Sequence, residues 1–96
     1  MELTELTAKQ NEIMAIAQEE CAEVIQAISK INRFGLENSH AGVTNKEHLE
    51  EEVGDLMCMF ELLEEFDLID WSHVAIHATN KRKKLQQWTT IFEDEC

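Results

Sequence analysis

The chain has 96 residues, a net charge of −12, no Pro and three Gly. This length allows at most one domain, which we take as residues 1–96. The excess of acidic residues argues against a nucleic-acid binder and against binding to an anionic membrane surface, because both need clustered Lys and Arg. The abundance of Glu, Leu, Ala, Ile, Lys and Gln favours helix, so we predict an all-α fold.

The first predicted helix covers residues 4–33. Apolar side chains recur every three or four residues from Leu6 to Ile31, which is the helical period. Gly35 follows as a natural terminator. Residues 35–44 contain two of the three glycines and have no clear period, so they are predicted to form a loop.

Two further helices are predicted, over residues 45–67 and 71–90. Thr44 and Glu47 match the capping box that begins many helices, and Asp70 is a suitable cap for the third helix. Three amphipathic helices predict a helical bundle. Because three helices leave much apolar surface open, we expect self-association as a dimer or tetramer to complete the bundle.

Two acidic motifs stand within these helices, Glu19–Glu23 and Glu52–Asp55. Residues three apart are neighbours on a helix surface, so each motif pairs two carboxylates. Glu20 and Glu52 fall on apolar faces, where an unpaired carboxylate is costly. A cation between the helices would account for all the carboxylates together, and an oxygen-only site suits Mg²⁺, with Mn²⁺ as a possible substitute. The predicted metal ligands are Glu20, Glu23, Glu52 and Asp55.

Half of the eight basic residues lie in the run Lys81–Lys84 of the third predicted helix. Lys81 falls on the apolar stripe of that helix, and Lys84 and Asn80 lie towards the same side. A basic run of this kind is either a solvated helix face or a local anion site. The sequence leaves both interpretations open.

The ordered pair of motifs, separated by a spacer of 28 residues, resembles the MazG-like all-α nucleoside triphosphate pyrophosphohydrolases. The segment Lys30–Gly35 and the basic stretch Asn80–Leu85 are also similar to that family. The resemblance extends over about residues 12–88. In its compactness the chain resembles short, stand-alone members, including those carried by bacteriophages.

The resemblance implies a Mg²⁺-dependent enzyme that converts a nucleoside or deoxynucleoside triphosphate to the monophosphate and pyrophosphate. It implies that the four predicted ligands hold the metal and that Glu19 orients or deprotonates the attacking water. The phosphate-binding residues that it implies are Lys81, Lys84, Asn80, Lys30 and Arg33.

Three alternatives stay open. One is the related phosphoribosyl-ATP pyrophosphatases, which share the arrangement of paired carboxylates. A ferritin-like di-iron bundle would use Glu-x-x-His motifs, and neither acidic motif supplies the His. A non-catalytic helical interaction module is the third.

The cellular setting follows from the cysteines and from hydropathy. Cys21, Cys58 and Cys96 show no metal-ligand spacing. No signal peptide is recognisable, and no apolar run approaches the ~20 residues that cross a bilayer. We therefore expect reduced thiols in a cytoplasm, which would be the host cytoplasm for a phage-borne protein.

Overall fold

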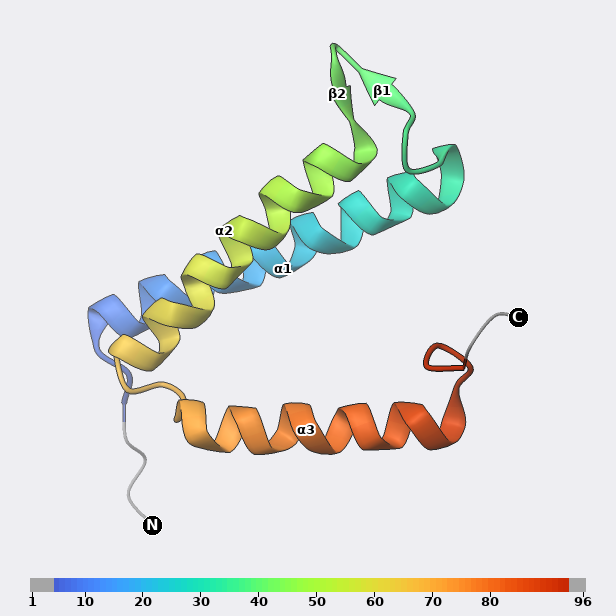
Figure 1. The fold of residues 1–96 in the computed structure, drawn as a ribbon. Helices are drawn as coiled ribbons and strands as arrows, with labels where there is room; N and C mark the ends of the chain where they lie inside the picture. Colours follow the sequence, from blue (N-terminus) through green and yellow to red (C-terminus); the bar gives the residue numbers. More distant parts are fainter. Residues whose placement is uncertain (1–4, 94–96) are drawn as a thin grey trace.

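The computed structural model describes residues 5–93 of the chain. It contains three long helices and one small antiparallel sheet (Figure 1). The elements in chain order are α1 (Ala8–Phe34), β1 (Ser39–His40), β2 (Val43–Thr44), α2 (Asn45–Glu65) and α3 (Trp71–Trp88). The predicted all-α class with three main helices is confirmed.

Helix α1 has a well-defined cap at each end. The Thr7 hydroxyl accepts a hydrogen bond from the Gln10 backbone N–H at 3.1 Å, and the Gln10 side chain accepts one from the Thr7 N–H at 3.0 Å. This capping box explains the start at Ala8 rather than near Thr4, which lies outside the described residues. At the other end, Gly35 has φ 91° and its N–H bonds to the Ile31 carbonyl, so the predicted terminator is confirmed.

The connection over residues 35–44 is not only a loop, as we predicted, because it contains the β1–β2 hairpin. Ser39 lies opposite Thr44 and His40 lies opposite Val43. Ala41 and Gly42 form the turn with φ values of 53° and 83°, the pattern of a two-residue hairpin turn with positive φ at both positions. Strands of two residues are too short to produce an alternating pattern, which is why the sequence did not reveal them.

Helix α2 begins where the capping motif places it and ends two residues before the predicted boundary. The Thr44 hydroxyl accepts from the Glu47 backbone N–H at 3.1 Å. At the C-terminal end, Asp67 adopts φ 62° and the Leu68 N–H bonds back to the Leu63 carbonyl. This is the Schellman arrangement, here with Asp instead of Gly in the left-handed position.

The core lies between α1 and α2, which run antiparallel side by side (Figure 1). Ile13, Ala17 and Met59 are buried at its centre. Leu62, Leu63, Phe66 and Leu68 pack around them. One polar bond also joins the helices, since the Gln10 side chain donates to the Phe66 carbonyl at 2.7 Å.

Helix α3 stands apart from this pair (Figure 1). Of the residues described, none in α3 is buried, and the helix ends at Trp88, two residues before the predicted boundary. The radius of gyration is 17.3 Å, whereas a compact domain of this length has about 12.5 Å. Within residues 5–93, helix α3 therefore buries none of its side chains against the α1–α2 pair.

Two further observations bear on the expected setting. Cys21 and Cys58 are free and exposed, while Cys96 lies outside the described residues. Within residues 5–93, no helix combines the length and apolar character needed to cross a membrane.

Candidate metal and active site

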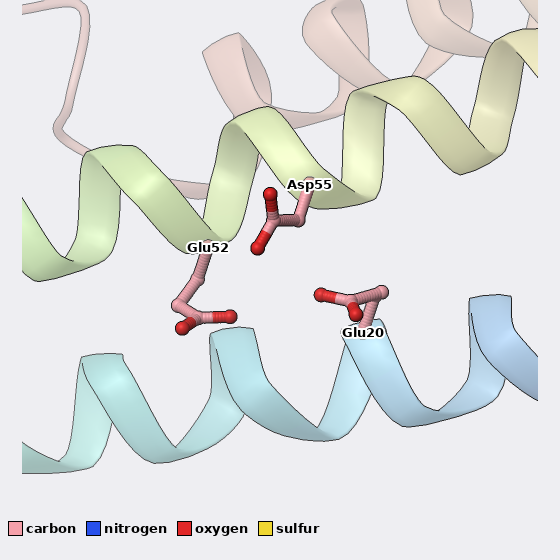
Figure 2. A group of neighbouring side chains, drawn as sticks. All are labelled: Glu20, Glu52 and Asp55. Carbon is pink, nitrogen blue, oxygen red and sulfur yellow. The ribbon is translucent and has the colours of Figure 1, made fainter.

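Three carboxylates from the two acidic motifs meet between α1 and α2. Glu20 projects from α1, and Glu52 and Asp55 project from α2 towards it (Figure 2). One oxygen from each of the three lies within 4.8 Å of the other two. Residues more than 30 positions apart in the chain therefore present their oxygens to one point.

The local reason for this meeting is that the acids share helix faces with the core. Glu20 follows the buried Ala17 by three residues, and Glu52 precedes the buried Met59 by seven. Both spacings keep the two residues of each pair on one side of a helix. Packing of Ala17 against Met59 therefore turns the carboxylates towards each other as well.

The electrostatics of the cluster are unfavourable without a counter-ion. Partial burial, and next the negative charges of Asp55 and Glu52, raise the pKa of the Glu20 carboxyl above its usual range. The Glu20 Oε2 atom is buried and has no hydrogen-bond partner. Such an unpartnered buried oxygen is uncommon in a folded protein and calls for an explanation such as an ion.

The protein itself supplies almost no positive charge to this cluster. In residues 5–93 the single ion-pair contact joins His48 to Glu52, and no Lys or Arg is paired with a carboxylate. Three converging oxygen donors with a surplus of negative charge fit a hard divalent cation. The residues present therefore suit the metal that the sequence predicts.

The other two acids of the first motif lie outside this group of three. Glu19 and Glu23 are exposed on α1. Both are nevertheless close enough for their charges to contribute to the raised pKa of Glu20. Their predicted roles, Glu23 as a fourth ligand and Glu19 as a base, stay predictions.

The three lysines of α3 line a surface depression that is formed by that helix alone. Its lining is His77, Asn80, Lys81, Lys83, Lys84 and Gln87. Lys83 therefore shares the depression with Lys81 and Lys84. Arg82 points elsewhere, since its guanidinium lies over the Phe92 ring at 4.8 Å.

The two basic residues predicted on α1 have different surroundings. Lys30 lines a depression beside the hairpin, together with His40, His48 and Glu51. The Arg33 guanidinium lies over the Phe34 ring at 5.0 Å. Within residues 5–93, none of the predicted phosphate-binding lysines and arginines forms an ion pair with the three carboxylates.

His48 is the neighbour of the cluster that sequence reasoning missed. Its Nε2 atom lies 3.2 Å from Oε1 of Glu52, one helical turn further along α2. The spacing of four residues was the available signal, because residues at i and i+4 are neighbours on a helix.

Comparison with known families identifies the arrangement. The family model of the MazG nucleotide pyrophosphohydrolase domain matches residues 8–88. The chain belongs to the MazG nucleotide pyrophosphohydrolase family. Comparison with curated proteins and with solved structures gave no significant match. The MazG match includes all three helices, so both acidic motifs and the basic run of α3 belong to the matched domain.

Membership in the MazG family supports a hydrolase that acts on nucleotides at a phosphoanhydride bond. Proteins of this family typically depend on a divalent metal, and the three carboxylates provide a group able to hold one. The site and the family therefore point to the same class of chemistry.

Proposed function

We propose that the protein hydrolyses nucleoside or deoxynucleoside triphosphates to the monophosphate and pyrophosphate, with Mg²⁺ as cofactor and Mn²⁺ as a possible substitute. The observation that carries the proposal is the convergence of Glu20, Glu52 and Asp55 within 4.8 Å in a MazG-family chain. Members of both acidic motifs contribute to that group, as a single shared metal centre requires.

Glu20, Glu52 and Asp55 would hold the cation, with Glu23 as a further ligand from the same side of α1. A bound divalent cation would neutralise charge on the triphosphate and lower the pKa of a water molecule. The carboxylates would also fix where the α-phosphorus lies, since positioning and charge neutralisation dominate catalysis of phosphoryl transfer.

Glu19 would act on the attacking water. Its exposed carboxylate lies next to Glu20 in the chain and is free to accept a proton at one oxygen. The water oxygen then bonds to the α-phosphorus, and the bond from that phosphorus to the bridging oxygen breaks. Pyrophosphate leaves, and the monophosphate keeps the new oxygen.

Phosphate oxygens would be bound by Lys81, Lys84 and Asn80 of α3, and secondarily by Lys30 and Arg33 of α1. Because α3 does not pack on α1 and α2 of its own chain, we propose that α3 from a second copy covers the carboxylate site. A dimer would achieve this, and a tetramer would bury more of the remaining apolar surface.

The test is a screen of the common nucleoside and deoxynucleoside triphosphates with Mg²⁺, in which monophosphate, diphosphate, pyrophosphate and orthophosphate are quantified separately. The proposal expects equal amounts of monophosphate and pyrophosphate from at least one nucleotide. Release of orthophosphate with diphosphate would contradict the cleavage position. No hydrolysis of any nucleotide would favour the non-catalytic module instead.

A further inference from the structure

The structure places one polar side chain directly against the carboxylate cluster from outside it. His48 lies on α2 one turn before Glu52, and its Nε2 atom is 3.2 Å from Glu52 Oε1. An imidazole that carries its proton on Nε2 is a donor at that atom, and it needs no positive charge to donate. At this distance a neutral His48 ring can donate to the Glu52 carboxylate.

The burial of the acceptor distinguishes this contact from an ordinary surface pair. Exposed ion pairs at i and i+4 contribute little to stability, because water competes for both groups. Here the Glu52 side chain is 11% exposed and the His48 side chain is 31% exposed. Among residues 5–93, no other hydrogen bond or ion pair to the Glu52 carboxylate is found. His48 is thus the one polar side chain of residues 5–93 that lies against this carboxylate from outside the cluster.

The direction of the carboxylate matters because its partners are on two helices. Glu52 must keep its oxygens towards Glu20 of α1 and Asp55 of α2 for the three to share a cation. A glutamate has three rotatable side-chain bonds, and donors outside a metal centre commonly hold such a ligand in its binding orientation. The His48 ring stands where it would limit this freedom.

We propose that His48 is a positioning residue, whose Nε2–H holds the Glu52 carboxylate in the orientation that binds the divalent cation. This inference rests on the proposed function, since it needs a cation at the cluster. His48 itself does not touch the cation or the nucleotide. Its effect is on the affinity of the site for metal.

The experiment measures Mn²⁺ binding to the full chain by electron paramagnetic resonance, without any nucleotide. Three substitutions separate the donor from the shape of the ring. His48→Gln keeps an N–H donor long enough to reach a residue four positions on, whereas His48→Asn is polar but shorter and His48→Leu has no donor. His73→Leu, at an exposed position of α3, is the matched control.

We expect His48→Leu and His48→Asn to weaken Mn²⁺ binding by about 10- to 100-fold, the usual effect of losing a group that supports a metal ligand. His48→Gln should retain most of the affinity, and His73→Leu should bind as the unaltered protein does. Circular dichroism and thermal melting in the metal-free state monitor folding. The Gln and Asn pair isolates the donor, because both amides are polar and sit at the same position.

Three results would overturn the inference. Unchanged Mn²⁺ affinity in both His48→Leu and His48→Asn would exclude a positioning effect while leaving the metal site intact. A loss in His48→Gln as large as in His48→Leu would show that the imidazole acts other than as an N–H donor. Absence of Mn²⁺ binding by the unaltered protein would refute the metal site itself, and the inference with it.

Discussion

The α1–α2 pair and helix α3 differ in what holds their functional side chains in place. The pair contains every residue found buried in the described chain, and its packing brings Glu20, Glu52 and Asp55 together. Helix α3 carries half of the basic residues but has no buried side chain. The three acids are therefore positioned by the core of a single chain, and the basic residues of α3 are not.

This contrast bears on how the negative charge of the carboxylate cluster is compensated in a chain with 12 more acidic than basic residues. In residues 5–93 no Lys or Arg compensates an acid by pairing with it. The two sources of compensation that we propose are a cation between α1 and α2 and helix α3 of another copy. The following predictions test these two sources of compensation separately.

The largest effect should come from the packed pair. Glu52→Gln removes a buried ligand charge and should lower Mg²⁺-dependent turnover at least about a hundredfold, because metal stabilisation of the reacting phosphate is worth several kcal/mol. The circular dichroism spectrum should keep its helical form. Steady-state kinetics on the best nucleotide provides the measurement. Glu61→Gln, at an exposed position of the same helix, should be nearly silent.

The next effect concerns the basic depression of α3. Lys81→Ala and Lys84→Ala should each lower kcat/KM about ten- to a hundredfold, because a charge-assisted phosphate contact contributes on the order of 1.5–3 kcal/mol. Lys83 lines the same depression. Lys83→Ala is therefore not a clean control for the other two substitutions.

Arg82 is the better control, because its guanidinium lies over Phe92 and away from the depression. Arg82→Ala should change kcat/KM little. Equal, small effects at Lys81, Lys84 and Arg82 would mean that the basic run is a solvated face. Phosphate binding would then have to be sought at Lys30 and Arg33.

Self-association should give a smaller effect, a roughly twofold increase in particle mass over that of a single chain. Sedimentation of the unaltered protein at micromolar concentration should give at least twice 11.1 kDa, since no side chain of α3 is buried within residues 5–93. Ile76 is 57% exposed on α3, so Ile76→Asp should shift the population towards monomer. Gln86→Asp adds the same charge at an exposed polar position. A well-folded monomeric unaltered protein would remove the argument for assembly.

The smallest effect concerns the pH dependence of stability in metal-free protein. The pKa of Glu20 is raised in the folded state. Its contribution to the free energy of unfolding is therefore most favourable in acid, and this contribution is lost as the pH rises through the folded-state pKa. Glu20→Gln should therefore melt at a higher temperature than the unaltered protein at neutral pH in EDTA. The difference should shrink towards acid, where Glu20 takes up a proton. A difference that does not vary with pH would contradict the proposed origin.

The helices show how much of the fold can be predicted from local sequence patterns. Spacing of apolar residues located all three, and the caps at Thr44, Asp70 and Gly35 set boundaries that the structure confirms. The errors lie where several caps compete or where tertiary contact intervenes. Helix α1 begins at Ala8 and not earlier, because Thr7 has Gln10 three residues later to complete the capping box and Gln10 also bonds to Phe66. The hairpin was missed because its strands have only two residues each.

The acidic motifs, their helical faces and their likeness to the MazG family were all readable from the sequence alone, because helical periodicity and residue chemistry are local properties. The tertiary structure decided which oxygens meet. Packing of Ala17 and Met59 selects Glu20, Glu52 and Asp55 for the centre and leaves Glu19 and Glu23 at its edge. It also decided that Glu52 is buried beside His48 and that α3 stands apart, since burial depends on packing between helices and not on spacing along the chain.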